Sequence, residues 1–173
     1  MDAPTRVDSG RDADEALVAI YTAQYRSLVR MAVLLLRDTA AAEDVVQDAF
    51  VAMHGSWRRI RDTDKALAYL RQAVVNRARS RLRHLKVVER KAPAPMPDAA
   101  SAEYGAMQAV ERTAVMTALR ELPNRQREVL VLRYYSDLSE AQIADALGIS
   151  PGAVKSHASR GIAALRDTLE SLS

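Results

Sequence analysis

SEAQIADALGISPGAVKSHASR, the stretch from Ser139 to Arg160, has the pattern of two helices separated by a tight turn. Ser139 followed three residues later by Gln142 fits a capping box, which would open a short helix. The apolar spacing carries this helix to Leu147. Gly148 follows directly and can adopt the positive φ that a tight turn requires. The stretch therefore predicts a helix, a glycine turn and the start of a second helix.

A second helix is predicted to begin just after this turn, because Ser150 is a favourable N-cap residue and Pro151 suits the first helical position. Helical spacing gives it one apolar, buried side, formed by Val154, Ala158, Ile162, Leu165 and Leu169. The outward residues, with Lys155 on their flank, are small or can form hydrogen bonds: Gly152, Ala153, Ser156, Ser159 and Arg160. Such a surface suits a helix that enters the DNA major groove, although a helical hairpin with merely solvated polar residues has the same caps.

The composition of the 173 residues favours a helical globular protein. Hydrophobic residues make up 49% and charged residues 27%, which is enough for a core, whereas aromatic residues contribute only 5%. The absence of cysteine excludes disulfides and thiolate metal sites. We expect a cytoplasmic protein, because the N-terminus lacks an apolar signal core and no run reaches the roughly 20 apolar residues of a membrane helix.

We expect no catalysis, no cofactor and no metal from this sequence. The three histidines, His54, His84 and His157, stand at spacings that fit no metal motif. The six glycines form no phosphate-binding loop. Acidic pairs such as Glu43 and Asp44 are placed on a predicted solvated helix face, without a nucleophile or histidine partner. An enzyme is therefore the weakest interpretation.

Charge is concentrated in one segment. Residues 58–91 contain twelve basic and three acidic side chains, a net charge of +9, whereas the whole chain carries only +3. A local basic block on an otherwise acidic chain is typical of a surface that binds a polyanion, and a solvated helix face is the alternative.

Prolines divide the helical pattern into two blocks. Pro93, Pro95 and Pro97 alternate with other residues and cannot continue a helix, so residues 88–103 are predicted to be a Pro/Ala-rich linker. The fold class is predicted to be all-α, with a first helical domain at 13–87 and a second, containing the helix-turn-helix, at 104–173. In the first domain Gly55 is expected to end the second helix, and the third helix is expected over 66–85. Further helices are expected at 106–119 and from Pro123.

Motifs in both blocks resemble one family. AEDVVQDAFV from Ala42, Trp57, and AYLRQAVVNRARS from Ala68 resemble the first domain of extracytoplasmic-function sigma factors of the sigma-70 family, in particular the actinobacterial sigma-E-like group. LPNRQREVL from Leu122, LSEAQIA from Leu138 and GAVKSHASRG from Gly152 look like their second domain. The resemblance covers residues 15–168 and implies a factor that binds core RNA polymerase and directs it to promoters.

The resemblance also implies roles for residues of the first domain. Asp44, Gln47 and Asp48 would dock on the clamp helices of the largest polymerase subunit. Asn76 and the loop at 61–67 would handle the upstream bases of the minus-ten element, since capturing a base requires polar groups for its edge and cations for the backbone. The basic residues expected at this element are Arg58, Arg59, Arg61, Arg71, Arg79 and Arg83.

In the second domain, the resemblance implies that Lys155, Ser156, Ser159 and Arg160 read the minus-thirty-five element. Arg125 and Arg127 would hold phosphates. An anti-sigma factor is a further expected partner, because the chain carries no sensor module and no cysteine of its own. The main alternative is a helix-turn-helix repressor or activator that acts without binding core polymerase. Its second half would look the same, so the first half discriminates between the two.

Overall fold

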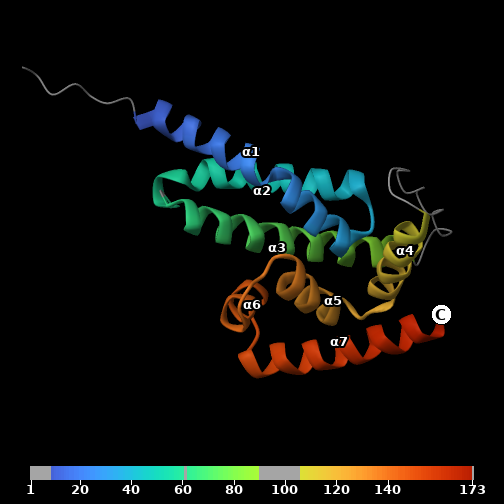
Figure 1. Ribbon diagram of the computed structural model, residues 1–173. Coiled ribbons are helices and arrows are strands. Elements are labelled where there is room, and N and C mark those ends of the chain that lie inside the picture. The colour runs from blue at the N-terminus through green and yellow to red at the C-terminus, as the bar shows by residue number, and fades with distance from the viewer. Residues whose placement is uncertain (1–8, 61, 90–105, 173) are drawn as a thin grey trace, which may run out of the picture.

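The computed structural model describes residues 9–60, 62–89 and 106–172, and the regular elements of these ranges are all helices (Figure 1). They are α1 (Ser9–Leu36), α2 (Thr39–Ile60), α3 (Thr63–Glu89), α4 (Ala106–Glu121), α5 (Asn124–Leu130), the π-helical turn η1 (Val131–Tyr135), α6 (Glu140–Leu147) and α7 (Pro151–Ser171). The predicted all-α class is confirmed. In the described part of the chain, no helix combines the length and apolarity needed to cross a membrane.

Helices α1, α2 and α3 pack against one another and form the first module. Their apolar stripes meet in a dry core that includes Met31 and Leu35 from α1, Val46 from α2, and Leu70 and Val74 from α3. Asp38 helps to start α2, because its carboxylate accepts a hydrogen bond from the backbone N–H of Ala41 at 3.2 Å. Side chains with a 3.6-residue period thus build the three-helix bundle that the sequence predicts.

The prediction that Gly55 ends the second helix was wrong, because α2 continues to Ile60. Glycine weakens a helix interior by about 1 kcal/mol, but Trp57 and Ile60 in the next turn pack against the core and offset that cost. Helix α3 is also longer than expected and runs from Thr63 to Glu89. After Ala78 none of its described side chains is fully buried. Leu82 still packs against the core, whereas the basic residues Arg81 and Arg83 are exposed.

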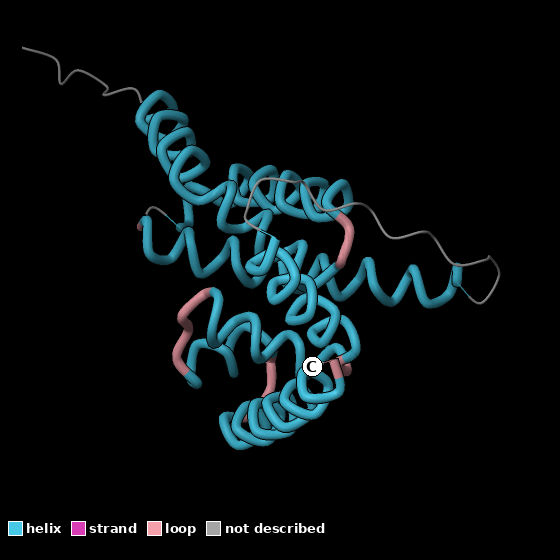
Figure 2. Tube along the Cα trace, turned by 45° about the vertical axis from the view of Figure 1, so that its right-hand side comes forward, coloured by secondary structure: helices cyan, strands magenta, loops and turns pink. Residues whose placement is uncertain are grey.

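Helices α4 to α7 and η1 form the second module. Leu132 of η1, Ile143 of α6 and Val154 of α7 are fully buried at its centre. The π-helical turn η1 is closed by the N–H of Ser136, which donates to the carbonyl of Val131 at 3.2 Å. Helix α7 lies along α5, α6 and α4 (Figure 2).

The two modules are in contact in this structure. Helix α3 packs against α6, and α1 packs against η1 and α5. The Ser136 hydroxyl donates to the Met31 sulfur at 3.2 Å, and the Arg37 guanidinium donates to the backbone carbonyl of Arg120. Most of the predicted linker at 88–103 lies outside the described residues, whereas positions 88 and 89 belong to α3. The division into domains at 13–87 and 104–173 remains our proposal.

Candidate nucleic-acid interface

The helix-turn-helix has the local geometry that its sequence predicts. The Ser139 hydroxyl accepts from the N–H of Gln142 at 3.2 Å, and the Gln142 side-chain oxygen accepts from the N–H of Ser139 at 2.8 Å. This pair is the capping box at the start of α6. Gly148 has φ of 63°, in the left-handed region that an L side chain rarely adopts. The Ser150 hydroxyl caps α7 by accepting from the N–H of Ala153 at 3.1 Å.

The outward face of α7 presents the predicted minus-thirty-five residues to solvent. Val154 and Ala158 are buried, which leaves these four side chains exposed: Lys155, Ser156, Ser159 and Arg160. The Arg160 Nε donates to the carbonyl of Ser156 at 3.3 Å. The Lys155 Nζ lies 3.9 Å from the Glu140 Oε1 of α6. The face therefore offers two cations and two hydroxyls at the start of a helix.

One apolar residue of α7 lies elsewhere than the sequence predicts. Ile162 is exposed rather than buried, and Gly161 occupies the close approach to α5 instead. A Cβ on Gly161 would lie 3.0 Å from the Leu130 Cδ1. The absence of a side chain at Gly161 lets the two helices come close, and this turns Ile162 towards the surface.

The predicted polymerase-binding residues form one exposed row on α2. Asp44, Gln47 and Asp48 lie one turn apart and are all exposed, because Val45, Val46 and Ala49 point into the core. This acidic row faces away from the buried side of the bundle and is open to a partner.

The predicted minus-ten residues fall into three groups. Four of them are exposed: Arg58, Arg59, Asn76 and Arg83. Of these, Arg58 and Arg59 lie in the last turn of α2. Arg71 is half-buried, and desolvation by burial lowers the pKa of its guanidinium. Arg61 lies outside the described residues. Arg83 follows Asn76 by about two turns of α3, so an exposed cation and an exposed amide share one side of that helix.

Arg79 is already engaged by the second module. Its Nε and Nη2 donate to the two carboxylate oxygens of Glu128, on α5, at 3.2 and 3.3 Å. Arg125 donates to the same carboxylate at 3.0 Å, and only 6% of the Glu128 side chain is exposed. Two arginines predicted to contact DNA in different domains thus share one carboxylate.

Arg127 does not have the surface position that the sequence analysis expected. It is only 1% exposed, and its guanidinium donates to the carbonyl of Leu122 at 3.2 Å and to the Asn124 side-chain oxygen at 2.6 Å. The carbonyl of Arg120 accepts a third bond at 3.4 Å. Burial, with Arg37 nearby, lowers the pKa of Arg127 to about 10, so it stays charged at neutral pH. Arg127 satisfies the open carbonyls at the end of α4 and is not accessible to a phosphate.

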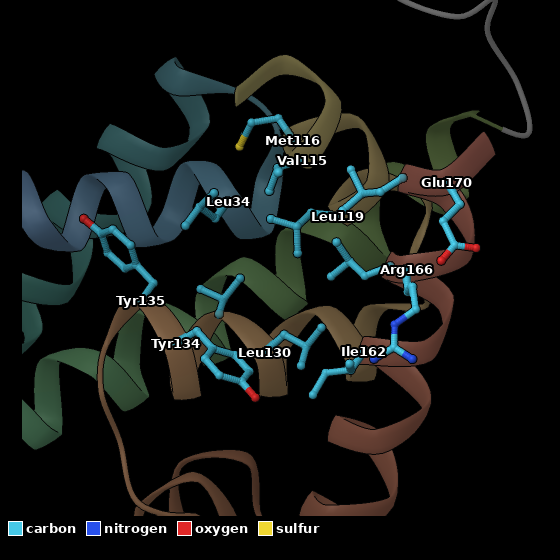
Figure 3. A pocket seen from close by; sticks show the side chains of 13 residues that line it. Leu34, Val115, Met116, Leu119, Leu130, Tyr134, Tyr135, Ile162, Arg166 and Glu170 are labelled. Carbon is cyan, nitrogen blue, oxygen red and sulfur yellow. The ribbon is translucent and has the colours of Figure 1, made fainter. Parts of the chain in front are cut away.

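A surface groove of about 1110 Å³ lies between the modules and was not predicted (Figure 3). Its wall from the first module is Leu34 of α1, while Val115 and Leu119 of α4 and Ile162 of α7 line the rest. Tyr134 of η1 is 65% exposed at its edge. Helical periodicity could not reveal this surface, because its walls come from helices far apart in the chain that meet only when the two modules pack.

Comparison with known proteins agrees with this geometry. The family model for sigma-70 region 2 matches residues 20–87, and the model for sigma-70 region 4 matches residues 112–165. These two matches cover the α1–α3 module and the helix-turn-helix module, and together they span more than half of the chain.

Curated relatives are similar over most of their length. The chain is 37% identical to the "RNA polymerase sigma-E factor" of Streptomyces avermitilis over 145 residues, which is 84% of this chain and 80% of that protein. It is 34% identical to the "ECF RNA polymerase sigma factor SigL" of Mycobacterium tuberculosis over 177 residues, covering 96% of this chain and 97% of that protein. This chain belongs to the extracytoplasmic-function group of the sigma-70 family.

Two solved structures share the fold. The sigma factor RpoE of Bartonella quintana, in complex with the anti-sigma factor NepR, has a TM-score of 0.71 and 25% identity, with 92% of this chain and 98% of that chain covered. CnrH in complex with the cytosolic domain of CnrY has a TM-score of 0.68 at 24% identity, which shows the fold alone. The chain is an RNA polymerase sigma factor, and the match to region 2 disfavours the alternative of an independent helix-turn-helix regulator.

Proposed function

We propose that the exposed surfaces of this sigma factor divide its work between the two modules. The acidic row of Asp44, Gln47 and Asp48 binds the clamp helices of core polymerase. Asn76 and the exposed arginines of the first module receive the opened minus-ten strand. The exposed face of α7 reads the minus-thirty-five element, and Arg125 holds a phosphate. The chain then needs no catalytic group, because the polymerase makes the bonds.

The observation that carries this proposal is the exposure of these side chains on well-packed helices. Each predicted contact residue other than Arg61, Arg71, Arg79, Arg125 and Arg127 is exposed, and the predicted residues of α7 and the acidic row of α2 stand beside buried residues of their own helices. A bidentate contact from an arginine such as Arg160 to guanine discriminates by roughly 1–3 kcal/mol. Rigid helices therefore hold the polar groups where a duplex or a clamp helix can reach them.

We also propose that an anti-sigma factor binds this chain, with an apolar helix in the groove between the modules. Tyr134, Val115 and Ile162 expose apolar surface there, and Arg166 and Glu170 provide polar groups at its edge. The solved structure of RpoE from Bartonella quintana, which shares the fold, contains the anti-sigma factor NepR. A partner in this groove would contact α1, α4 and α7 together and so hold both modules.

Transcription reconstituted from purified core polymerase tests the proposal. Core polymerase with this chain should give transcripts with discrete start sites on genomic fragments. Asp48→Arg should lower the amount of these transcripts at least tenfold by weakening core binding. Asp167→Arg, an equal charge reversal at an exposed position of α7, serves as the control. No discrete start site with the wild-type chain would contradict the proposed function, and equal activity of the two variants would place the docking surface elsewhere.

A further inference from the structure

Arg79, Arg125 and Glu128 form an ion-pair cluster that joins the two modules. Arg79 lies on α3 of the first module, while Arg125 and Glu128 lie on α5 of the second. The Arg79 guanidinium contacts both carboxylate oxygens, at 3.2 and 3.3 Å, and Arg125 adds a bond of 3.0 Å. Bidentate charge-assisted bonds of this kind are stronger and more directional than neutral ones.

The cluster is sheltered from solvent. The side chain of Glu128 is 6% exposed, that of Arg79 is 23% exposed and that of Arg125 is 32% exposed. Screening by water and salt is therefore weaker here than at a surface ion pair. Removing one partner would leave a charge in a largely closed site, so the contact resists separation of the modules.

The geometry of the closed structure conflicts with simultaneous binding of both promoter elements. Elements near minus ten and minus thirty-five are about 25 base pairs apart, which is about 85 Å of duplex at 3.4 Å per step. Arg79 and Arg125 touch the same carboxylate, and even α3, with 27 residues, is only about 40 Å long. The modules must therefore separate before Arg79 and Arg125 can act at the two elements.

The chain has the covalent length for that separation. Residues 90–105 can span at most about 55 Å when fully extended, and the helices on both sides add to this reach. Opening then exchanges one internal carboxylate for two external phosphates, one for each arginine. In the closed form Glu128 therefore engages the guanidinium groups that DNA phosphates would contact in the open form.

We propose that Glu128 is an autoinhibitory residue, which keeps the free sigma factor closed by binding the two arginines that contact promoter DNA. The closed form then hides Arg79 and Arg125 from DNA until another partner separates the modules. The conformational part rests on the ion-pair cluster alone, whereas the competition with DNA rests on the proposed phosphate contacts. In the free protein, the apparent DNA affinity equals the affinity of the open form multiplied by the fraction of molecules that are open.

A distance measurement tests the closure directly. Because the sequence contains no cysteine, spin labels can be attached at Ala23→Cys on α1 and Ala163→Cys on α7, two exposed positions in the different modules. Glu128→Gln in this background should raise the ratio of open to closed molecules about tenfold, as expected for losing a hydrogen bond to a charged group. Glu15→Gln, the same chemical change at an exposed position of α1, should leave the distance distribution unchanged.

A second variant covers the possibility that Glu128→Gln perturbs the second module. Arg79→Gln removes the contact from the first module and leaves Glu128 paired with Arg125, so the second module keeps its internal ion pair. It should also open the molecule. An unchanged distance distribution in both variants, with the helical circular dichroism of the wild type, would overturn the proposal.

Binding to a fluorescent 40-base-pair duplex, measured at several salt concentrations, tests the competition. Each phosphate contact contributes about −0.9 to the slope of log affinity against log salt. Glu128→Gln should steepen this slope by about one to two relative to Glu15→Gln, because both variants gain the same charge and only the former frees two arginines. If the molecule opens and the salt slope does not change, closure does not regulate DNA binding, and the autoinhibition proposal is overturned. The proposed phosphate contacts of Arg79 and Arg125 then fail as well. Transcription with core polymerase would be unaffected by this result, so it tests the proposed function separately.

Discussion

The buried arginine of the second module gives the sharpest test of the structure. Arg127→Met keeps most of the apolar stem and removes the guanidinium that binds the carbonyl of Leu122 and the side chain of Asn124. A buried acceptor left without a donor costs about 1–3 kcal/mol. Asn124 is only half-buried and can bind water instead, so the expected loss is about 2–3 kcal/mol in the free energy of unfolding.

Thermal unfolding measures this loss. For a chain of this size, 1 kcal/mol corresponds to about 2–4 °C, so Arg127→Met should lower Tm by about 4–12 °C. Arg125→Met is the matched control, because Arg125 is two positions away, half-buried and proposed to hold a phosphate. It should change Tm less and reduce the salt slope of DNA binding by about one in the opened protein.

Arg127→Met should therefore lower Tm without changing the salt slope of DNA binding, whereas Arg125→Met should lower the salt slope with a smaller change in Tm. A structural role for Arg127 would be refuted if the free energy of unfolding of Arg127→Met lay within about 0.5 kcal/mol of the wild-type value, the usual range for surface substitutions. It would also be refuted if folded Arg127→Met lost one unit of salt slope as Arg125→Met does. Either result would return Arg127 to the DNA-binding surface that the sequence analysis predicted.

Two further predictions concern the helix-turn-helix. Arg160→Ala should weaken promoter binding by roughly 1–3 kcal/mol and relax the preference at one base pair, as measured by binding to a set of single-substitution duplexes; an unchanged preference would remove Arg160 from the readout. Ser139→Ala should destabilise the second module by about 1–2 kcal/mol in urea unfolding, because it removes the hydroxyl that accepts from the N–H of Gln142 at the start of the eight-residue α6. Ser150 caps the longer α7, and Ser150→Ala should cost about 1 kcal/mol. A larger loss of stability in Ser150→Ala than in Ser139→Ala would contradict this expectation.

Local signals in the sequence were sufficient to predict most of the fold. The caps at Ser139 and Ser150 and the turn at Gly148 follow from short-range hydrogen bonding and backbone sterics, and the structure has all three. Helix ends without such a signal were predicted less well. Gly55 has the residue type of a helix end, yet tertiary packing of Trp57 and Ile60 carries α2 past it.

The candidate site was predicted where exposure follows from helical phase. Asp44, Asp48, Lys155 and Arg160 stand opposite buried residues on their own helices, so periodicity alone places them on the surface. Arg79 and Arg127 have the same residue type as the exposed arginines. Their different roles depend on which carboxylate or carbonyl another helix brings to them, and residue type cannot reveal that.

The sequence by itself determined that this chain is helical, where its recognition helix begins and which family it belongs to, because these depend on neighbours within a few positions and on local motifs. Only the tertiary structure decided that Glu128 joins two distant arginines, that Arg127 is buried, and that a groove opens beside Tyr134. These features arise from contacts between segments far apart in the chain, and such contacts form only when the helices pack.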